Sequence, residues 1–265
     1  PGQYNREALE KINTNWKDVV FRDNAPTQSY EVSVAGGAKN VNYYLSAGYF
    51  SQEGTAVGSS FKRYNIRANV EAEATKWLKI GTNTASTYSE SEETEYGSYS
   101  VFAPISASKF MMPYWTPYKA DGSFTTTKDG SWVGAYGNPM EYLAANPLTR
   151  NKVHVMSSTF LELTPIENLK IRTMVGIDGS DTRSNTTSLP SYPSNYGSGA
   201  VGKGYAQVFN LTWTNTANYS FSIKNAHNIN LLLGHEVTKN GSDAFSVTTR
   251  GQSNDKLLTL STGTM

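Results

Sequence analysis

The sequence predicts an all-β chain that forms an antiparallel transmembrane β-barrel segment of eight strands, and three observations support this fold class. Charged residues make up only 17% of the 265 residues, whereas Tyr (17), Gly (22), Thr, Ser and Asn are abundant. Such a composition favours strands and turns over helices. Apolar and polar residues alternate in eight stretches, and the connections between those stretches alternate between short and long.

Charge, cysteine content and hydropathy narrow the class of protein further. The net charge is +1 with both signs scattered, so no basic face is expected for nucleic acid. The chain has no Cys, which excludes disulfides and thiolate metal sites. The longest apolar run, at 231–233, is far below the roughly 18 residues of a membrane helix. The mean hydropathy of -0.48 suits strands that are apolar on alternate positions only.

The first four predicted strands carry the clearest alternation. They are expected at 28–36, 41–50, 61–74 and 77–88. In the third, Ile66 and Val70 fall on one face and Arg67 on the other. A short amphipathic helix is expected before them, at 3–12.

The other four strands repeat the pattern after a long gap. They are expected at 152–164, 169–178, 205–219 and 228–237. In the seventh, Leu211 and Trp213 share a face opposite Thr212. Strands of this length exceed those usual in soluble sheets.

The lengths of the connections between strands indicate whether the apolar face of the sheet points inward or toward lipid. Short hairpins are expected at 37–40, 75–76, 165–168 and 220–227. Long connections are expected at 51–60, 89–151 and 179–204, followed by a tail from Thr238. Alternation alone does not say whether the apolar face points inward or toward lipid. Short turns at one end and long loops at the other are typical of an outer-membrane barrel, with periplasmic turns and extracellular loops.

The face prediction can be stated residue by residue. The residues expected to point out of the barrel are Ile66, Val70, Leu161, Leu163, Leu211 and Trp213. The residues expected to point toward the lumen or the plug are Arg67, Asn69, Glu71 and Glu162. Aromatic residues near strand ends are consistent with an interfacial girdle or with ordinary β propensity: Tyr30, Tyr43, Tyr49, Tyr64, Trp77, Tyr88 and Tyr219.

Four segments in the first third of the chain resemble a known family. Residues 13–22, N-T-N-W-K-D-V-V-F-R, are similar to the N-T-D-W-x-D-x-I-F-R segment of SusC/RagA-type TonB-linked outer-membrane proteins. Residues 42–54, N-Y-Y-L-S-A-G-Y-F-S-Q-E-G, resemble the family's N-Y-Y-x-S-x-G-Y-x-x-Q-E-G. Residues 61–67 and 76–81 resemble F-x-R-Y-N-x-R and K-W-L-K-I-G. Weaker matches continue at 121–123, 146–148, 227–230 and 254–257, so the resemblance covers most of the chain.

The resemblance implies a role in a larger assembly. A barrel of this family closes about 22 strands around a plug, and at this chain's rate the barrel would need about 700 residues. Residues 1–265 are therefore expected to be part of one TonB-dependent receptor β-barrel domain, with the plug domain and the remaining strands absent. The chain opens at Pro1 with no signal-peptide pattern, so a processed chain or an internal piece is expected.

The implied function is transport without enzyme chemistry. It would be nutrient import across a Gram-negative outer membrane, for oligosaccharides or oligopeptides. The implied partners are a SusD-like surface lipoprotein, TonB through the absent plug segment, and outer-membrane lipid. No cofactor is expected.

Motifs that could carry chemistry are weak. Residues 197–202 satisfy G-x-G-x-x-G but follow a loop and precede a strand, which is the wrong context for nucleotide binding. The histidines, His154, His227 and His235, lack ligand-spaced partners, so neither a catalytic nor a metal site is predicted. The acidic stretch Glu90, Glu92, Glu93 and Glu95 leaves two alternatives open, calcium binding or solvated charge.

The predicted substrate-contact residues lie in the longest loop. They are Tyr114, Trp115, Tyr118, Trp132 and Tyr136. Aromatic rings of this density suit stacking on sugars or packing against peptide side chains, or else packing of the loop on itself.

Two rival interpretations remain at this stage. The chain could be a complete eight-stranded outer-membrane barrel with a structural or adhesive role. It could also be a secreted carbohydrate-binding β-domain. Pairing between the strands at 28–36 and 228–237 would identify the complete eight-stranded barrel. The transporter interpretation requires both of these strands to be open edges.

Overall fold

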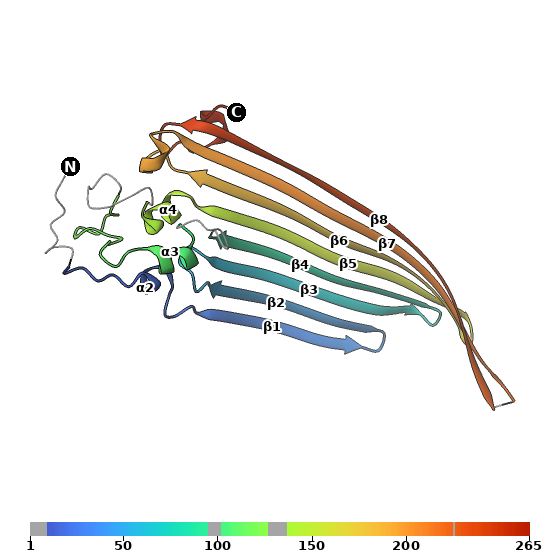
Figure 1. Ribbon diagram of the computed structural model, residues 1–265. Coiled ribbons are helices and arrows are strands. Elements are labelled where there is room, and N and C mark those ends of the chain that lie inside the picture. Colours follow the sequence, from blue (N-terminus) through green and yellow to red (C-terminus); the bar gives the residue numbers. More distant parts are fainter. Residues whose placement is uncertain (1–9, 95–101, 127–136, 225) are drawn as a thin grey trace.

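The computed structural model describes residues 10–94, 102–126, 137–224 and 226–265. Eight antiparallel strands form one arched sheet, in which each strand pairs with the next along the chain (Figure 1). The strands are β1 Thr27–Ala38, β2 Val41–Glu53, β3 Ser60–Thr75, β4 Leu78–Glu93, β5 Leu148–Ile166, β6 Leu169–Ser188, β7 Gly199–Ile223 and β8 His227–Gln252. The predicted number, order and antiparallel pairing are confirmed.

Short turns and long connections separate to opposite ends of the sheet. The hairpins β1–β2, β3–β4 and β5–β6 turn at 39–40, 76–77 and 167–168, all at the end away from the helices (Figure 1). Asn168 has φ 68°, which tight two-residue turns require and Asn tolerates. The longer connections gather at the other end with the helices, as the sequence predicted.

The later strands are longer than their alternation suggested. β6 continues past Asp178, β7 begins before Tyr205, and β8 continues past Thr238, where a loop or tail was expected. Those expectations were wrong because alternation disappears where both faces meet water, while backbone pairing persists. Gln207 opposite Asp243 illustrates a rung that is polar on the otherwise apolar face. Trp77 was expected in a strand and lies in the β3–β4 turn instead.

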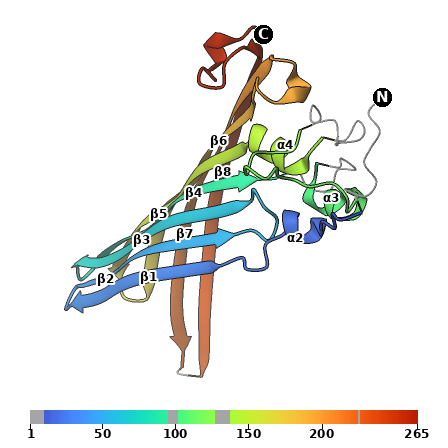
Figure 2. The ribbon, with the colours of Figure 1, turned by 90° about the vertical axis from the view of Figure 1, so that its left-hand side faces the viewer.

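In the part of the chain that the structure describes, three short α-helices lie at the loop end of the sheet: α2 Trp16–Val20, α3 Pro104–Phe110 and α4 Pro139–Ala145 (Figure 2). Single 3-10 turns occur at η2 Pro193–Asn195 and η3 Leu260–Thr262. Of the helix expected at 3–12, residues 3–9 lie outside the described residues, and Glu10 and Lys11 form a turn. No helix within the described ranges is long and apolar enough to cross a membrane.

The sheet is open. Its strand order runs from β1 to β8, and over the residues that the structure describes these two outer strands pair only with β2 and β7. The prediction that the strands at 28–36 and 228–237 are both edges is confirmed, which excludes the closed eight-stranded barrel.

Candidate functional site

The pairing register sorts the side chains into two faces, because residues directly opposite each other in a ladder share a face. Ile66, Val70, Leu161, Leu163, Leu211 and Trp213 all fall on one face, and Arg67, Asn69, Glu71 and Glu162 on the other. We call these the apolar face and the polar face. The separation was predicted from alternation, whereas the rows described below depend on the register.

One row of the apolar face carries apolar residues on five successive strands. This row lies near the turns and runs through Leu78, Leu163, Ile171, Ala217 and Leu233 of β4 to β8. Large side chains on this face lie open to the surroundings, with Ile66 62% and Trp213 47% exposed. Continuous exposed apolar surface of this kind indicates contact with a membrane or another protein.

A row of four tyrosines borders the apolar face toward the loop end. Tyr30, Tyr49, Tyr64 and Tyr88 stand directly opposite one another on β1 to β4. Their successive ring centroids are 6.4, 5.1 and 6.3 Å apart. Rings with an apolar body and a polar tip favour a boundary between apolar and aqueous surroundings. The register thus supports the girdle interpretation for these four residues.

The polar face carries a matching set of hydrogen-bonding rows. One row crosses β3 to β8 through Asn69, Asn83, Ser158, Gly176, Thr212 and Thr238. His154 Nε2 lies 2.7 Å from Asp178 Oδ1 nearby. This row can exchange hydrogen bonds with a hydrated solute.

Charges of opposite sign alternate in one row of the polar face near the turns. Glu73, Lys79, Glu162 and Arg172 stand in register across β3 to β6. Lys79 Nζ lies 2.7 Å from Glu71 Oε1, and Arg172 Nη1 lies 3.7 Å from Glu162 Oε2. Sequence reasoning placed Glu71 and Glu162 on this face but did not identify the row, since the register between strands was unknown.

An aromatic ring fills the gap beside that charged row. Phe160 is 5% exposed, its ring lies against Gly81, and the guanidinium carbon of Arg172 stands 3.7 Å from the ring centroid. A side chain at Gly81 would collide with the ring. Gly81 therefore allows Phe160 to lie flat on the polar face, where it holds Arg172 by a cation–π contact.

The motif at 13–22 builds helix α2 and attaches it to the loop that follows β4. Asn15 caps the helix by accepting a 3.2 Å hydrogen bond from Lys17 N. The Trp16 indole donates a 2.9 Å hydrogen bond to the Met112 carbonyl, and Thr14 N donates to the Pro113 carbonyl.

The end of the same motif holds the β2–β3 connection. Arg22 Nη1 lies 2.7 Å from the Gly54 carbonyl and 3.1 Å from that of Ala56, and Nη2 lies 3.3 Å from Glu53 Oε2. The Arg22 side chain thus joins the 13–22 motif to the Q-E-G end of the 42–54 motif. This contact gives Arg22 of one motif and Glu53 and Gly54 of the other a shared structural role.

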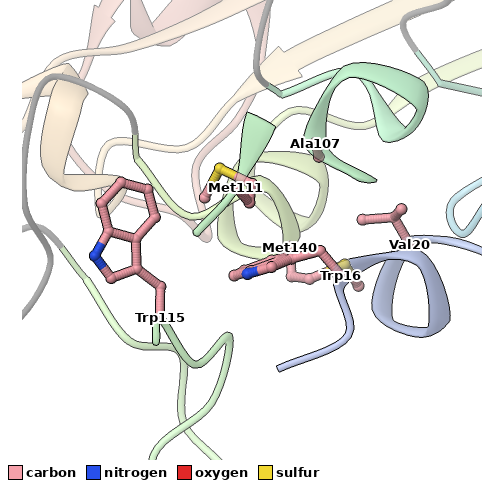
Figure 3. Close-up of a cluster of buried hydrophobic side chains, with 6 residues drawn as sticks. All are labelled: Trp16, Val20, Ala107, Met111, Trp115 and Met140. Atoms are coloured by element: carbon pink, nitrogen blue, oxygen red, sulfur yellow. The ribbon is translucent and has the colours of Figure 1, made fainter. Parts of the chain in front are cut away.

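Helices α2, α3 and α4 converge on a small hydrophobic core (Figure 3). Its buried members are Trp16, Val20, Ala107, Met111, Trp115 and Met140. Asn138, fully buried, reinforces it by capping α4 and donating to the carbonyls of Pro117 and Thr125 at 2.6 and 3.0 Å. We call α2 to α4, with the described residues between α3 and α4, the loop cluster.

The predicted substrate-contact residues divide into three groups. Trp115 is 7% exposed and packs in the core of the loop cluster. Tyr114 and Tyr118 are 38% and 43% exposed, and the Tyr118 ring stacks on Phe124 with centroids 5.5 Å apart. Trp132 and Tyr136 lie outside the described residues. Burial separates packing rings from accessible rings, a distinction that the sequence did not contain.

A tight turn presents the accessible Tyr118. Gly122 takes φ 82°, and Asp121 Oδ1 accepts hydrogen bonds from Ser123 Oγ and N at 2.7 and 2.9 Å. The hydrogen bonds from Ser123 hold the pKa of the Asp121 carboxyl below its ordinary value. This is the weakly family-like D-G-S segment, and its physical role is to close the turn.

The weak chemical motifs have ordinary structural roles where they are described. Gly197 takes φ 79° in the turn before β7, and 199–202 begin that strand, so no helix follows the glycines. Glu93 Oε1 pairs with Arg150 at 3.2 Å, and Glu90 accepts a hydrogen bond from Tyr88. Glu95 lies outside the described residues, and among those described no three acidic or histidine side chains gather to hold a metal ion.

Comparisons with known proteins place this geometry among transporter barrels. No model of a known protein family matches the chain. TonB-dependent receptor P3 of Formosa agariphila is 28% identical over 238 residues, covering 86% of this chain and 23% of that protein. TonB-dependent receptor SusC of Bacteroides thetaiotaomicron is 37% identical over 62 residues, 23% of this chain and 6% of that protein.

The fold matches solved structures over almost the whole chain. The RagAB peptide importer in its closed-closed state superposes with a TM-score of 0.82 and 28% identity, over 96% of this chain and 29% of that chain. The chain spans less than a third of the length of each of these proteins.

Proposed function

We propose that this chain corresponds to a barrel segment of a SusC/RagA-type TonB-dependent transporter. On that premise, it forms part of the wall of the barrel through which an oligomeric nutrient crosses an outer membrane. Residues 1–265 would belong to a single barrel domain that other strands of the intact transporter complete. The observation that carries the proposal is the in-register separation of an apolar face from a polar face across all eight strands.

The apolar face would contact lipid in this arrangement. A transmembrane strand needs about 9 to 11 residues tilted by about 45°. On β3 the apolar positions run from Tyr64 to Ala72, and on β5 from Val153 to Leu163. Both stretches match the thickness of a membrane, and the tyrosine row would lie at its outer boundary.

The polar face would line the lumen. The loop end supports this assignment, because Tyr142 and Leu143 of α4 lie over Thr186, Gly202 and Thr248, which are all polar-face positions. The loop cluster therefore extends over the polar face, where it could contact a solute that enters the barrel from outside. The exposed rings of Tyr114 and Tyr118 are the side chains of this cluster that we assign to substrate contact, with Trp115 supporting them from the core.

Partner proteins would capture the substrate and supply the energy for transport. We infer a SusD-like surface lipoprotein at the loop end and a plug segment that connects the transporter to TonB at the turn end. The similarity to RagAB, a peptide transporter, and to SusC supports the lipoprotein partner. Both an oligosaccharide and an oligopeptide fit the polar wall, and no enzyme chemistry is needed for import.

Deletion of the gene for the intact transporter tests the function. The deletion strain should lose growth on one oligomeric nutrient at limiting concentration and keep growth on the corresponding monomer. A variant without the TonB-contacting segment should behave like the deletion, because energised transport requires that contact. The intact protein should also be found in the outer-membrane fraction. Unchanged growth of the deletion strain on every oligosaccharide and peptide tested would refute import.

A further inference from the structure

Two basic residues, Arg183 of β6 and Lys203 of β7, lie side by side on the apolar face of the sheet, toward its loop end. Arg183 stands directly opposite Tyr205, and Lys203 directly opposite Asn185, so the two cations are diagonal neighbours on one face. Such neighbours lie about 7–8 Å apart, within reach of long side chains. Both are exposed, and neither forms an ion pair or a side-chain hydrogen bond with any residue that the structure describes. They can therefore close on one anion.

The carboxylates of the same face do not neutralise this pair. Asp181, the nearest along β6, accepts hydrogen bonds from two side chains of β7 at 3.0 and 3.1 Å. Asp243 lies on β8 on the side toward the turn end, and Glu90 and Glu92 lie on β4, two strands from β6. Within the described ranges, none of these carboxylates forms an ion pair with either cation. The positive charge of the pair is available to a ligand.

The pair lies at the height of a lipid headgroup. The large apolar side chains of this face end at Ile177 on β6 and at Phe209 on β7, each six positions from the cation of its strand. Six residues of a strand tilted by about 45° rise about 14 Å. Long basic side chains extend back toward the apolar boundary, so their charged ends reach the headgroup layer.

Apolar surface adjoins the two cations. Phe245 of β8 stands directly opposite Tyr205, their ring centroids are 5.5 Å apart, and Phe245 is 62% exposed. Closer to the turns, Gly241 stands opposite Phe209, and a Cβ atom on it would meet only the Phe209 carbonyl oxygen, at 3.9 Å. The bare backbone at Gly241 leaves room for a hydrocarbon chain beside Phe209. A ligand with an anionic head and an apolar tail fits this surface.

We propose that Arg183 and Lys203 bind the phosphate of a lipid headgroup in the outer leaflet, with a hydrocarbon chain passing Phe245 and Gly241. This inference rests on the proposed location of the apolar face in the membrane and adds a specific lipid site to it. Inorganic phosphate would satisfy the cations but leave Phe245 uncovered, which favours a lipid as the occupant.

Native mass spectrometry of the purified, delipidated intact transporter in detergent tests the site. The probes are lipid A with two phosphates and phosphatidylcholine, whose own cation offsets its phosphate. The wild type should bind lipid A more tightly. The double variant Arg183→Gln with Lys203→Gln should bind lipid A about thirtyfold more weakly, since each basic residue near an anionic lipid contributes about fivefold. Lys62→Gln is the control, because Lys62 is exposed on the same face but has Glu90 directly opposite it, and it should bind like the wild type.

Three further measurements make the outcome decisive. The variant Arg183→Lys with Lys203→Arg keeps both charges and should retain lipid A. The urea midpoint of the glutamine double variant should match that of the wild type, since both side chains are exposed. Inorganic phosphate at the concentration of the lipid should not displace lipid A.

Equal binding of lipid A by the glutamine double variant and the wild type would overturn the proposal, as would complete displacement of lipid A by inorganic phosphate. Either result leaves import itself intact, because the growth assay above measures transport independently of this site.

Discussion

Val70 and Asn69 are neighbours in β3 whose side chains point to opposite faces, so they form a matched pair for testing which face meets lipid. Val70 is 37% exposed on the apolar face. We expect Val70→Lys in the intact transporter to cost about 2–4 kcal/mol near the membrane midplane, because a charge there loses its hydration. Asn69→Lys should cost much less, since a lysine on the polar face stays in water.

The measurement is the urea midpoint of the intact transporter refolded into lipid vesicles. Equal loss of stability in the two variants would contradict the face assignment. A larger loss for Asn69→Lys would reverse it.

Arg22 supports a second prediction at this scale. Its guanidinium is within hydrogen-bond distance of three carbonyls of the β2–β3 connection, those of Gly54, Ala56 and Ser59, and also contacts Glu53. Arg22→Lys keeps the charge but loses the planar fork, so we expect a cost of about 1–2 kcal/mol and faster hydrogen exchange at 54–59. Arg63→Lys is the control, because the Arg63 guanidinium stands over the Phe50 ring and weakening that contact should cost about 0.5–1 kcal/mol. Unchanged exchange at 54–59 in Arg22→Lys would show that the fork is dispensable.

Individual residues were predictable to different degrees. The face of Ile66 or Arg67 follows from period two alone. The burial of Trp115 and the exposure of Tyr118 did not, because both are aromatic residues in one irregular loop. Only contacts with α2 and α4, distant in sequence, separate them.

At the scale of elements, helix α2 determines whether the loop cluster has a core. Trp16 is 3% exposed and joins α2 to both α3 and α4. We expect Trp16→Ala to remove about 3–5 kcal/mol of local stability, as large-to-small substitutions of buried Trp do. Trypsin should then cut the intact transporter after Lys109 and Lys119 while the barrel stays folded.

Phe110→Ala is the matched control for that substitution. Phe110 belongs to the same cluster but is 60% exposed, so its loss should leave the proteolysis pattern unchanged. Equal resistance of Trp16→Ala and the wild type would mean that the cluster does not depend on its core.

The strands show where periodicity stops being informative. β1 to β4 agree with their predicted ranges within a few residues, apart from the extended end of β4. β8 instead continues to Gln252, well past Val237. The extra residues include polar side chains on both faces, such as Lys239 on one and Asn240 on the other, so no alternation marks them as strand. Pairing with β7 keeps them extended.

At the scale of the whole molecule, the open edges and the bare apolar face make the isolated chain incomplete. Val32 of β1 is 76% exposed and Leu233 of β8 is 75% exposed. Unpaired edge strands next to apolar surface template association. We expect residues 1–265 expressed alone to aggregate in buffer, and the same residues within the intact transporter to be monodisperse in detergent.

Size-exclusion chromatography with light scattering checks this outcome. A soluble monomer of the isolated chain without detergent would contradict it and favour the secreted β-domain interpretation. Association that detergent fully reverses would assign the effect to the apolar face rather than to the strand edges.

The sequence by itself determined the fold class, the number and order of strands, the two faces and the ends at which short and long connections lie. Those features depend on local periodicity and on distances along the chain, which a single sequence contains. The tertiary structure alone decided the register, and with it the tyrosine row, the charged row at Lys79 and Arg172, and the position of α4 over Thr186 and Gly202. Each of these joins strands through hydrogen bonds whose alignment depends on the whole sheet, so the residues that meet in them cannot be identified until the strands are paired.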